Sequence, residues 1–266
     1  MRRIAVGSPA GLFIRNPPSD FVRAGLRIGP KALKSLPVID PKQATSDALA
    51  HAAKGDLERA ASMLNKICSA YKEFGPAYVA HALVFLMAGD TAQCMTDLDA
   101  ADWANQEYGT PDQVRQAREL RVVALAVRTL YGGQNEAEAC RKLCDELRQN
   151  GVPMSWLFLP AVCFEWLWKE EDAKRWLAVL QKHRELSTAC AQFLQRATGW
   201  TSFLSKGGST AELAPVHFAR HLRAKREGDT GGAAKHLKRL QEIVRPLEAW
   251  DVIARYASGA ATVETV

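Results

Sequence analysis

The residues with the clearest potential for chemistry are histidines and cysteines spaced one helical turn apart. His217 and His221 stand in "HFARH", and Cys140 and Cys144 have the same spacing. A zinc-protease helix needs a glutamate beside its first histidine as general base, and Phe218 stands there instead. A zinc site on the cysteines would need two further ligands, and no second CxxC or HxxxH lies near them. Neither pair therefore predicts a metal site.

Other catalytic signatures are missing as well. The stretch "KGGST" at 206–210 lacks the spacing and the following lysine of a phosphate-binding loop. There is no GxSxG elbow, and no serine, histidine and carboxylate stand in a recognisable frame. The sequence therefore predicts a protein that is not an enzyme and that has no cofactor, no metal and no small-molecule substrate.

Basic side chains gather towards the C-terminus. Residues 220–245 contain eight Lys or Arg and three Asp or Glu. Helical spacing would place five of them on one face of two neighbouring helices: Arg220, Arg223, Lys235, Lys238 and Arg239. This pattern has two interpretations. One is the solvated face of two amphipathic helices; the other is a contact with a phosphate backbone or an acidic protein.

The first 39 residues carry the whole net charge of +6, because the remaining chain has 28 basic and 28 acidic side chains. The basic residues of this arm are Arg2, Arg3, Arg15, Arg23, Arg27, Lys31 and Lys34. Frequent Pro and Gly predict an extended segment, although its many apolar side chains are unlike a disordered tail. We expect an arm that docks on an acidic partner or an RNA backbone; packing along the body and an organellar transit-like origin stay open.

From about residue 43 the apolar residues repeat with helical periodicity and without period-2 alternation, which predicts an all-α fold. Gly, Pro and Asp between the periodic stretches supply helix stops and starts. The expected helices are 43–54, 57–72, 76–88, 91–106, 112–131, 135–149, 153–168, 170–184, 186–205, 213–227, 230–244 and 247–257. Trp166, Trp168 and Trp176 are expected to fill the seam between 153–168 and 170–184.

Two of the helix joints, Gly55-Asp56 and Gly89-Asp90, lie 34 residues apart, and Gly228-Asp229 forms a third. Superposing the first two pairs Ala48 with Ala82, Ala60 with Cys94, Leu64 with Leu98 and Ile67 with Ala101. Small residues would then stand where paired helices approach closely. Residues 43–106 and 213–244 therefore resemble the tetratricopeptide repeat. The resemblance implies antiparallel helix pairs stacked as an irregular α-solenoid that binds partner proteins on its concave face.

The stretch "NEAEACRKLCDELRQNGVPMSW" is similar to the second helix and linker of a pentatricopeptide repeat. Cys140, Leu143, Cys144 and Leu147 have that family's spacing of small and apolar residues, and Gly151 and Pro153 follow. Pentatricopeptide arrays bind single-stranded RNA, one base per repeat. Two helices that simply pack together would explain the stretch equally well.

The predicted organisation is therefore an extended basic arm (1–42), a helical-repeat domain (43–258) and a C-terminal tail (259–266). The favoured function is a non-catalytic scaffold or adaptor, a subunit of a larger assembly. The alternative is an RNA-associated component of an organellar ribonucleoprotein such as a ribosome. The six cysteines lie in apolar-periodic stretches, which predicts buried free thiols in a reducing compartment, either the cytoplasm or the mitochondrial matrix. No apolar run is long enough to cross a bilayer.

Overall fold

The computed structural model describes residues 40–149, 157–182 and 210–261, and these residues form helices and connections without a strand. This confirms the predicted all-α fold. The predicted arm (1–42) lies outside the described residues except at its last three positions, and the expected helix at 186–205 lies wholly outside them. Within the described ranges, no helix combines the length and the apolar character that a membrane span requires.

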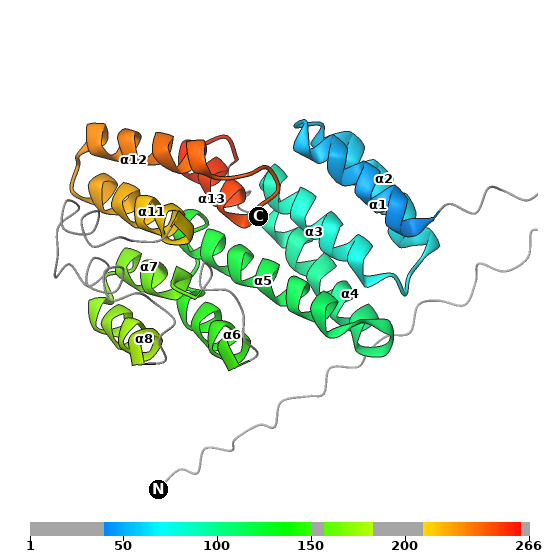
Figure 1. The fold of residues 1–266 in the computed structure, drawn as a ribbon, viewed down its shortest axis with the longest axis horizontal. Helices are drawn as coiled ribbons and strands as arrows, with labels where there is room; N and C mark the ends of the chain where they lie inside the picture. The colour runs from blue at the N-terminus through cyan, green and yellow to red at the C-terminus, as the bar shows by residue number, and fades with distance from the viewer. Residues whose placement is uncertain (1–39, 150–156, 183–209, 262–266) are drawn as a thin grey trace, which may run out of the picture. The chain divides into compact units, whose positions relative to one another are not determined.

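Eleven helices are described (Figure 1). The first six are α1 (Pro41–Ala53), α2 (Leu57–Ala70), α3 (Gly75–Ala88), α4 (Thr91–Tyr108), α5 (Pro111–Tyr131) and α6 (Ala137–Gln149). The others are α7 (Leu159–Trp166), α8 (Glu170–Lys182), α11 (Thr210–Arg226), α12 (Thr230–Ile243) and α13 (Ala249–Ser258).

The three Gly-Asp joints have the same local geometry. Gly55, Gly89 and Gly228 have φ angles of 87°, 104° and 78°, in the left-handed region that favours glycine. The aspartate after each glycine caps the next helix, because its carboxylate accepts a hydrogen bond from the backbone N–H three residues later. The same aspartate's N–H donates to the carbonyl five residues earlier, at 2.9–3.1 Å. The helix-stop chemistry predicted at these joints is confirmed.

Consecutive helices pack against each other from α1 to α8 and again from α11 to α13 (Figure 1). In addition, α1 packs on α3, α3 on α5 and α5 on α7. The residues superposed across the first two joints are all buried, as the spacing predicts: Ala48, Ala60, Leu64, Ile67, Ala82, Cys94, Leu98 and Ala101. Small and medium apolar side chains therefore occupy the positions where these helices approach one another.

The last helix, α13, packs on α3 and α5 and so joins the end of the chain to its first half. The hydroxyl of Tyr256 donates a 2.7 Å hydrogen bond to the carbonyl of Leu86 across 170 residues of sequence. The ring of Tyr256 also stacks on Tyr131, with centroids 5.7 Å apart. Trp250, near the start of α13, packs against Phe158 and Phe218.

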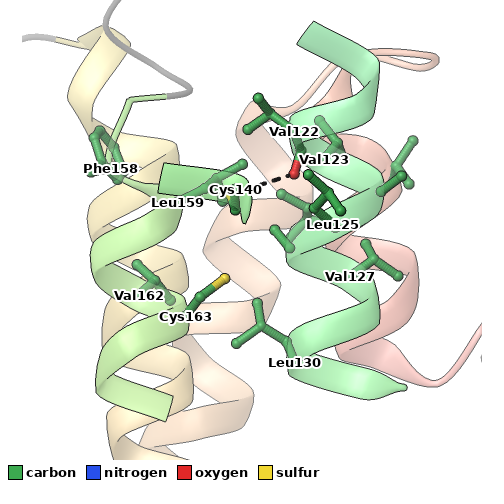
Figure 2. Close-up of a cluster of buried hydrophobic side chains, with 14 of the residues drawn as sticks. Val122, Val123, Leu125, Val127, Leu130, Cys140, Phe158, Leu159, Val162 and Cys163 are labelled. Atoms are coloured by element: carbon green, nitrogen blue, oxygen red, sulfur yellow. Dashed lines mark hydrogen bonds between the residues drawn. The ribbon is translucent and has the colours of Figure 1, made fainter. Parts of the chain in front are cut away.

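The larger hydrophobic cluster is centred on α5, which is buried along most of its second half. Figure 2 shows Leu130 of α5 pointing towards Cys163 of α7, and Cys140 of α6 donates to the carbonyl of Val122 at 3.8 Å. A second, smaller cluster joins α1, α2 and α3 around Leu64. The side chain of Leu247, before α13, packs against both clusters.

Expectations in the α7–α8 region were confirmed only in part. Of the helix predicted at 153–168, residues 153–156 lie outside the described residues, and α7 covers Leu159–Trp166, with Pro160 in its first turn, where proline is tolerated. Trp176 is buried, as expected, and its indole N–H donates to the carbonyl of Leu157 at 2.5 Å. Trp168, by contrast, is 71% exposed and does not fill the seam.

Candidate functional site

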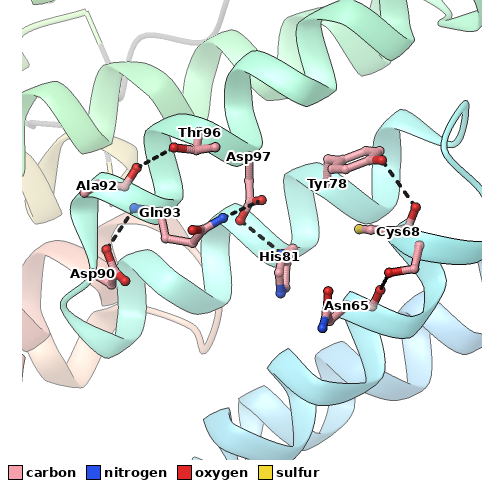
Figure 3. A network of polar contacts seen from close by, with 10 residues as sticks. Asn65, Cys68, Tyr78, His81, Asp90, Ala92, Gln93, Thr96 and Asp97 are labelled. Atoms are coloured by element: carbon pink, nitrogen blue, oxygen red, sulfur yellow. Dashed lines mark hydrogen bonds and ion pairs between the residues drawn. The ribbon is translucent and has the colours of Figure 1, made fainter. Parts of the chain in front are cut away.

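A buried polar network links α2, α3 and α4 (Figure 3). His81 Nδ1 lies 3.1 Å from Asp97 Oδ2, and the amide of Gln93 donates to Asp97 Oδ1 at 3.1 Å. The hydroxyl of Tyr78 donates to the backbone carbonyl of Cys68 at 3.3 Å. His81 and Asp97 are both almost completely buried, so each needs the other as a partner.

Although this network contains a cysteine, a histidine and an aspartate, its chemistry is unlike that of a nucleophilic triad. Burial, and secondly the negative charge of Asp97, raise the pKa of Cys68 to about 12. The thiol therefore keeps its proton at neutral pH, whereas a catalytic cysteine needs a lowered pKa. The contacts of His81 and Asp97 join α3 to α4, which is a structural role.

Three thiols gather where α6 meets α7. The neighbouring thiols of Cys144 and Cys163, followed by burial, raise the pKa of Cys140. The five cysteines in the described ranges are free and buried, which confirms that prediction for them; Cys190 lies outside those ranges. Across residues 40–149, 157–182 and 210–261, no group of three or more His, Cys, Asp or Glu side chains is arranged to hold a metal ion.

Three histidines form a cluster between α11 and α12. The Nδ1 atoms of His217 and His236 are 3.1 Å apart, and Arg220 Nε donates to His236 Nε2 at 3.4 Å. The arginine contact places the proton of neutral His236 on Nδ1, from which it is donated to His217. His221 Nδ1 lies 2.9 Å from the carbonyl of Ala233. The cluster is thus a buried, neutral connection between two helices.

The basic residues predicted on α11 and α12 do not form one exposed surface. Arg223 is buried and makes a two-point ion pair with Glu165 of α7, at 2.7 and 3.2 Å. Arg220 is half-buried against the histidine cluster. Three predicted residues remain exposed on α12: Lys235, Lys238 and Arg239. Arg239 also pairs with Glu242 at 2.6 Å.

The predicted partner-binding residues of the arm all lie outside the described residues: Arg2, Arg3, Arg15, Arg23, Arg27, Lys31 and Lys34. Their role therefore stays a prediction.

Among the described residues, an open groove that could receive a partner lies at the ends of α2 and α4. Its volume is about 630 Å³, and we call it the Tyr108 groove. It is lined by Pro41, Ser69, Ala70, Tyr71, Lys72, Glu73, Phe74 and Tyr108. Three of these are aromatic, and Tyr108 is 57% exposed, which is unusual for a side chain of its size.

Four helix ends meet at the Tyr108 groove, because α1 begins there at Pro41 and α3 begins at Gly75, directly after the lining residue Phe74. Both α2 and α4 end there, and neither has a basic residue in its last turn to balance the negative end of the helix dipole. A hydrogen bond to the Glu107 carboxylate, followed by the negative charge of Glu73, raises the pKa of the Tyr108 hydroxyl. Both carboxylates are therefore within electrostatic reach of the groove.

Sequence reasoning missed the Tyr108 groove because its walls come from the start of α1, the α2–α3 connection and the end of α4. One signal was available. The helix α4 contains acidic side chains, no basic one, and the two aromatic residues Trp103 and Tyr108, all of which can be read from the sequence. Comparison of this chain with protein-family models, with curated proteins and with solved structures finds no match.

Proposed function

We propose that this chain is a non-catalytic helical scaffold or adaptor that binds a partner protein at the Tyr108 groove, as a subunit of a larger assembly. The observation that carries the proposal is the groove itself, where Tyr71, Phe74 and Tyr108 come together at an open surface. Tyrosine is among the residues that contribute most to binding at protein interfaces. A groove of this size accepts one or two side chains of a docking segment.

The packing order of the helices supports a repeat-like scaffold. Contacts between α1 and α3, α3 and α5, and α5 and α7 are those expected when helix pairs stack side by side. The recurring Gly-Asp joints agree with tetratricopeptide-like units. In this proposal the array is an irregular solenoid, and its own helix α13 covers part of α3 and α5, which leaves the helix ends as the docking region.

The basic arm would supply a second contact. Residues 1–39 hold the chain's whole net charge of +6, and apolar side chains lie among its arginines. Such a segment suits an acidic surface on the assembly.

An RNA-associated role is the second candidate, and the exposed Lys235, Lys238 and Arg239 of α12 favour it. Cations on one helix can bind a phosphate backbone without recognising bases. This surface is reduced because Arg223 is already paired with Glu165. Protein binding therefore agrees better with the described residues.

The proposal is tested by isolating the full chain with its bound proteins and RNA, then repeating the binding with the purified partner. Tyr108→Ala should weaken binding of that partner at least tenfold, because it removes the exposed aromatic side chain of the groove. Trp103→Ala is the matched control, since Trp103 is a similarly exposed aromatic residue of α4 that does not line the groove.

Release of the partner by nuclease, together with a steep fall of binding with salt, is what RNA contacts require, and this outcome would contradict the protein scaffold. Equal loss of binding in Tyr108→Ala and Trp103→Ala would contradict the groove as the docking site.

A further inference from the structure

We propose that this chain exchanges its helix α13 with a second copy of itself, so that α13 of one copy packs on α3 and α5 of the other. The inference goes beyond the proposed scaffold function and does not rest on the Tyr108 groove. It depends on the turn that precedes α13 and on the contacts that the exchange preserves.

The connection between α12 and α13 is a tight turn that contains an unfavourable residue. The backbone N–H of Glu248 donates to the carbonyl of Arg245 at 3.1 Å, which closes a four-residue β-turn around Pro246 and Leu247. Leu247 has a φ of 66°, in the left-handed region. Proline at the second position and a left-handed third residue are the type II pattern, whose third position favours glycine or asparagine. The leucine therefore puts the turn under strain.

Opening the turn relieves this strain. Leu247 then returns to the extended backbone region that side chains prefer, and the φ that the ring of Pro246 fixes also suits an extended chain. The hydrogen bond that opening breaks joins Arg245 and Glu248, which are both exposed, so water replaces it. Short connections under strain favour exchange of the element that follows them between copies of a chain.

The contacts of α13 can be made by a second copy as well as by its own chain. The hydroxyl of Tyr256 donates to the carbonyl of Leu86 in α3, and its ring stacks on Tyr131 in α5. Trp250 packs against Phe218 in α11. All three partners precede the turn in sequence, so the same contacts form when α13 comes from another chain. The exchanged dimer therefore keeps these contacts of the monomer.

The exchange is reciprocal, which defines its stoichiometry. Each copy donates one α13 and receives one, so the pair closes with two-fold symmetry and leaves neither receiving surface empty. The balance between monomer and dimer then depends on the turn, whose strain favours the dimer, and on protein concentration. Because Trp250 and Tyr256 are buried, exchange in the folded protein requires local unfolding, and refolding is the step at which it occurs.

The test refolds the full chain from urea at high and at low protein concentration and measures its mass by light scattering. High concentration should give a dimer and low concentration a monomer. Isotope-labelled and unlabelled chains refolded together then show how the copies associate. Isotope-filtered NMR should detect a contact between Tyr131 of one copy and Tyr256 of the other, whose ring centroids lie 5.7 Å apart in the fold.

Two substitutions in the turn form a matched pair. Leu247→Ala and Leu247→Gly both remove a side chain that packs against the two hydrophobic clusters, but only glycine adopts the left-handed backbone without strain. This strain corresponds to a factor of about ten for each turn, and the dimer opens two turns. The glycine variant should therefore dimerise at least tenfold more weakly than the alanine variant.

Three results would overturn the inference. One is a chain that stays monomeric after refolding at every concentration. Another is a dimer that lacks the filtered contact between Tyr131 and Tyr256, because its copies then associate without exchange. The third is equal dimerisation of the two Leu247 variants. The effect of Tyr108→Ala on partner binding bears on none of these results, so this inference and the scaffold proposal fail separately.

Discussion

The guanidinium of Arg226 lies over the indole of Trp168, 3.4 Å from the ring centroid. The same guanidinium donates to the carbonyl of Glu165 at 2.6 Å and to the carboxylate of Glu170 at 2.9 Å. One side chain from the end of α11 thus holds the whole turn between α7 and α8. Arg223, one helical turn earlier, pairs with the side chain of Glu165. Arg223, which was predicted on an exposed basic face, therefore makes an internal contact, as does Arg226.

We expect Arg223→Ala to lower the free energy of unfolding by about 3 kcal/mol, because it leaves Glu165 with most of its burial and without its two-point partner. Urea unfolding of the full chain measures the change. Arg175→Ala removes an arginine from an exposed pair with Asp172 and should change stability by less than about 1 kcal/mol. Equal effects of the two substitutions would show that the Arg223 contact is not a buried ion pair.

Trp168 combines an exposed ring with a left-handed backbone, at φ 60°. Trp168→Gly and Trp168→Ala both remove the contact with Arg226, but only glycine also relieves the backbone strain. The glycine variant should therefore be more stable than the alanine variant by about 1 kcal/mol. Thermal unfolding of the two variants side by side measures this difference, and an alanine variant as stable as the glycine variant would argue against strain at this turn.

The histidine cluster predicts loss of stability in acid. Burial, followed by the charge of Arg220, lowers the pKa of His236 to about 4, and burial also lowers the pKa values of His217 and His221. A histidine in the unfolded chain has a pKa near 6.5, so the unfolded state binds protons first as pH falls. Stability should be complete above about pH 6.5 and fall down to about pH 4, with His236 contributing about 3 kcal/mol.

Most charged groups that face this cluster also lower the histidine pKa values. Lys225 of α11 and Lys235 and Arg239 of α12 add positive charge, and Glu242 opposes them at His217. His236→Gln should flatten the dependence of unfolding free energy on pH, whereas His51→Gln on α1 controls for removal of a histidine outside the cluster. A parent chain with the same stability at pH 7 and pH 4.5 would contradict the prediction.

Gly75, at the start of α3, is packed against the side chain of Asn105. A Cβ atom at position 75 would lie 2.0 Å from Asn105 Oδ1, too close for any real contact. Gly75→Ala should therefore destabilise the protein by about 1–3 kcal/mol.

The double variant Gly75→Ala/Asn105→Ala should recover most of this loss. The Asn105 amide is buried, and neither its nitrogen nor its oxygen has a hydrogen-bond partner. Removing this amide therefore lowers the free energy of unfolding little. Denaturant unfolding of both single variants and the double variant forms a cycle that measures the coupling. Additive effects would contradict a direct clash.

The helical fold could be predicted from sequence because its signals are local. Glycine at 55, 89 and 228 with a following aspartate needs only neighbouring backbone groups to stop one helix and start the next. Burial of Leu64 and Leu98 likewise follows from helical periodicity. The position of Trp168 could not be predicted this way, because its ring contacts Arg226, 58 residues later in the chain.

The places of the charged side chains in the fold were harder to predict than their number. Arg223 has the helical spacing of an exposed basic face, yet its partner Glu165 comes from a distant helix that no local pattern connects to it. The Tyr108 groove has the same difficulty, since Pro41, Phe74 and Tyr108 meet only after the four helices α1 to α4 have packed. Sequence periodicity shows which face of a helix is apolar but not which surfaces meet, and partner-binding sites depend on the latter.

The hydrogen bond from Tyr256 to Leu86 has a consequence for synthesis. At typical translation rates of about 5–20 residues per second, the 170 residues between them take roughly 10–30 s to be made. During that interval the surfaces of α3 and α5 that later receive α13 face water, although the neighbouring helices can already fold. A chain whose synthesis stops before α13 would keep this apolar surface exposed, and chaperones bind surfaces of this kind.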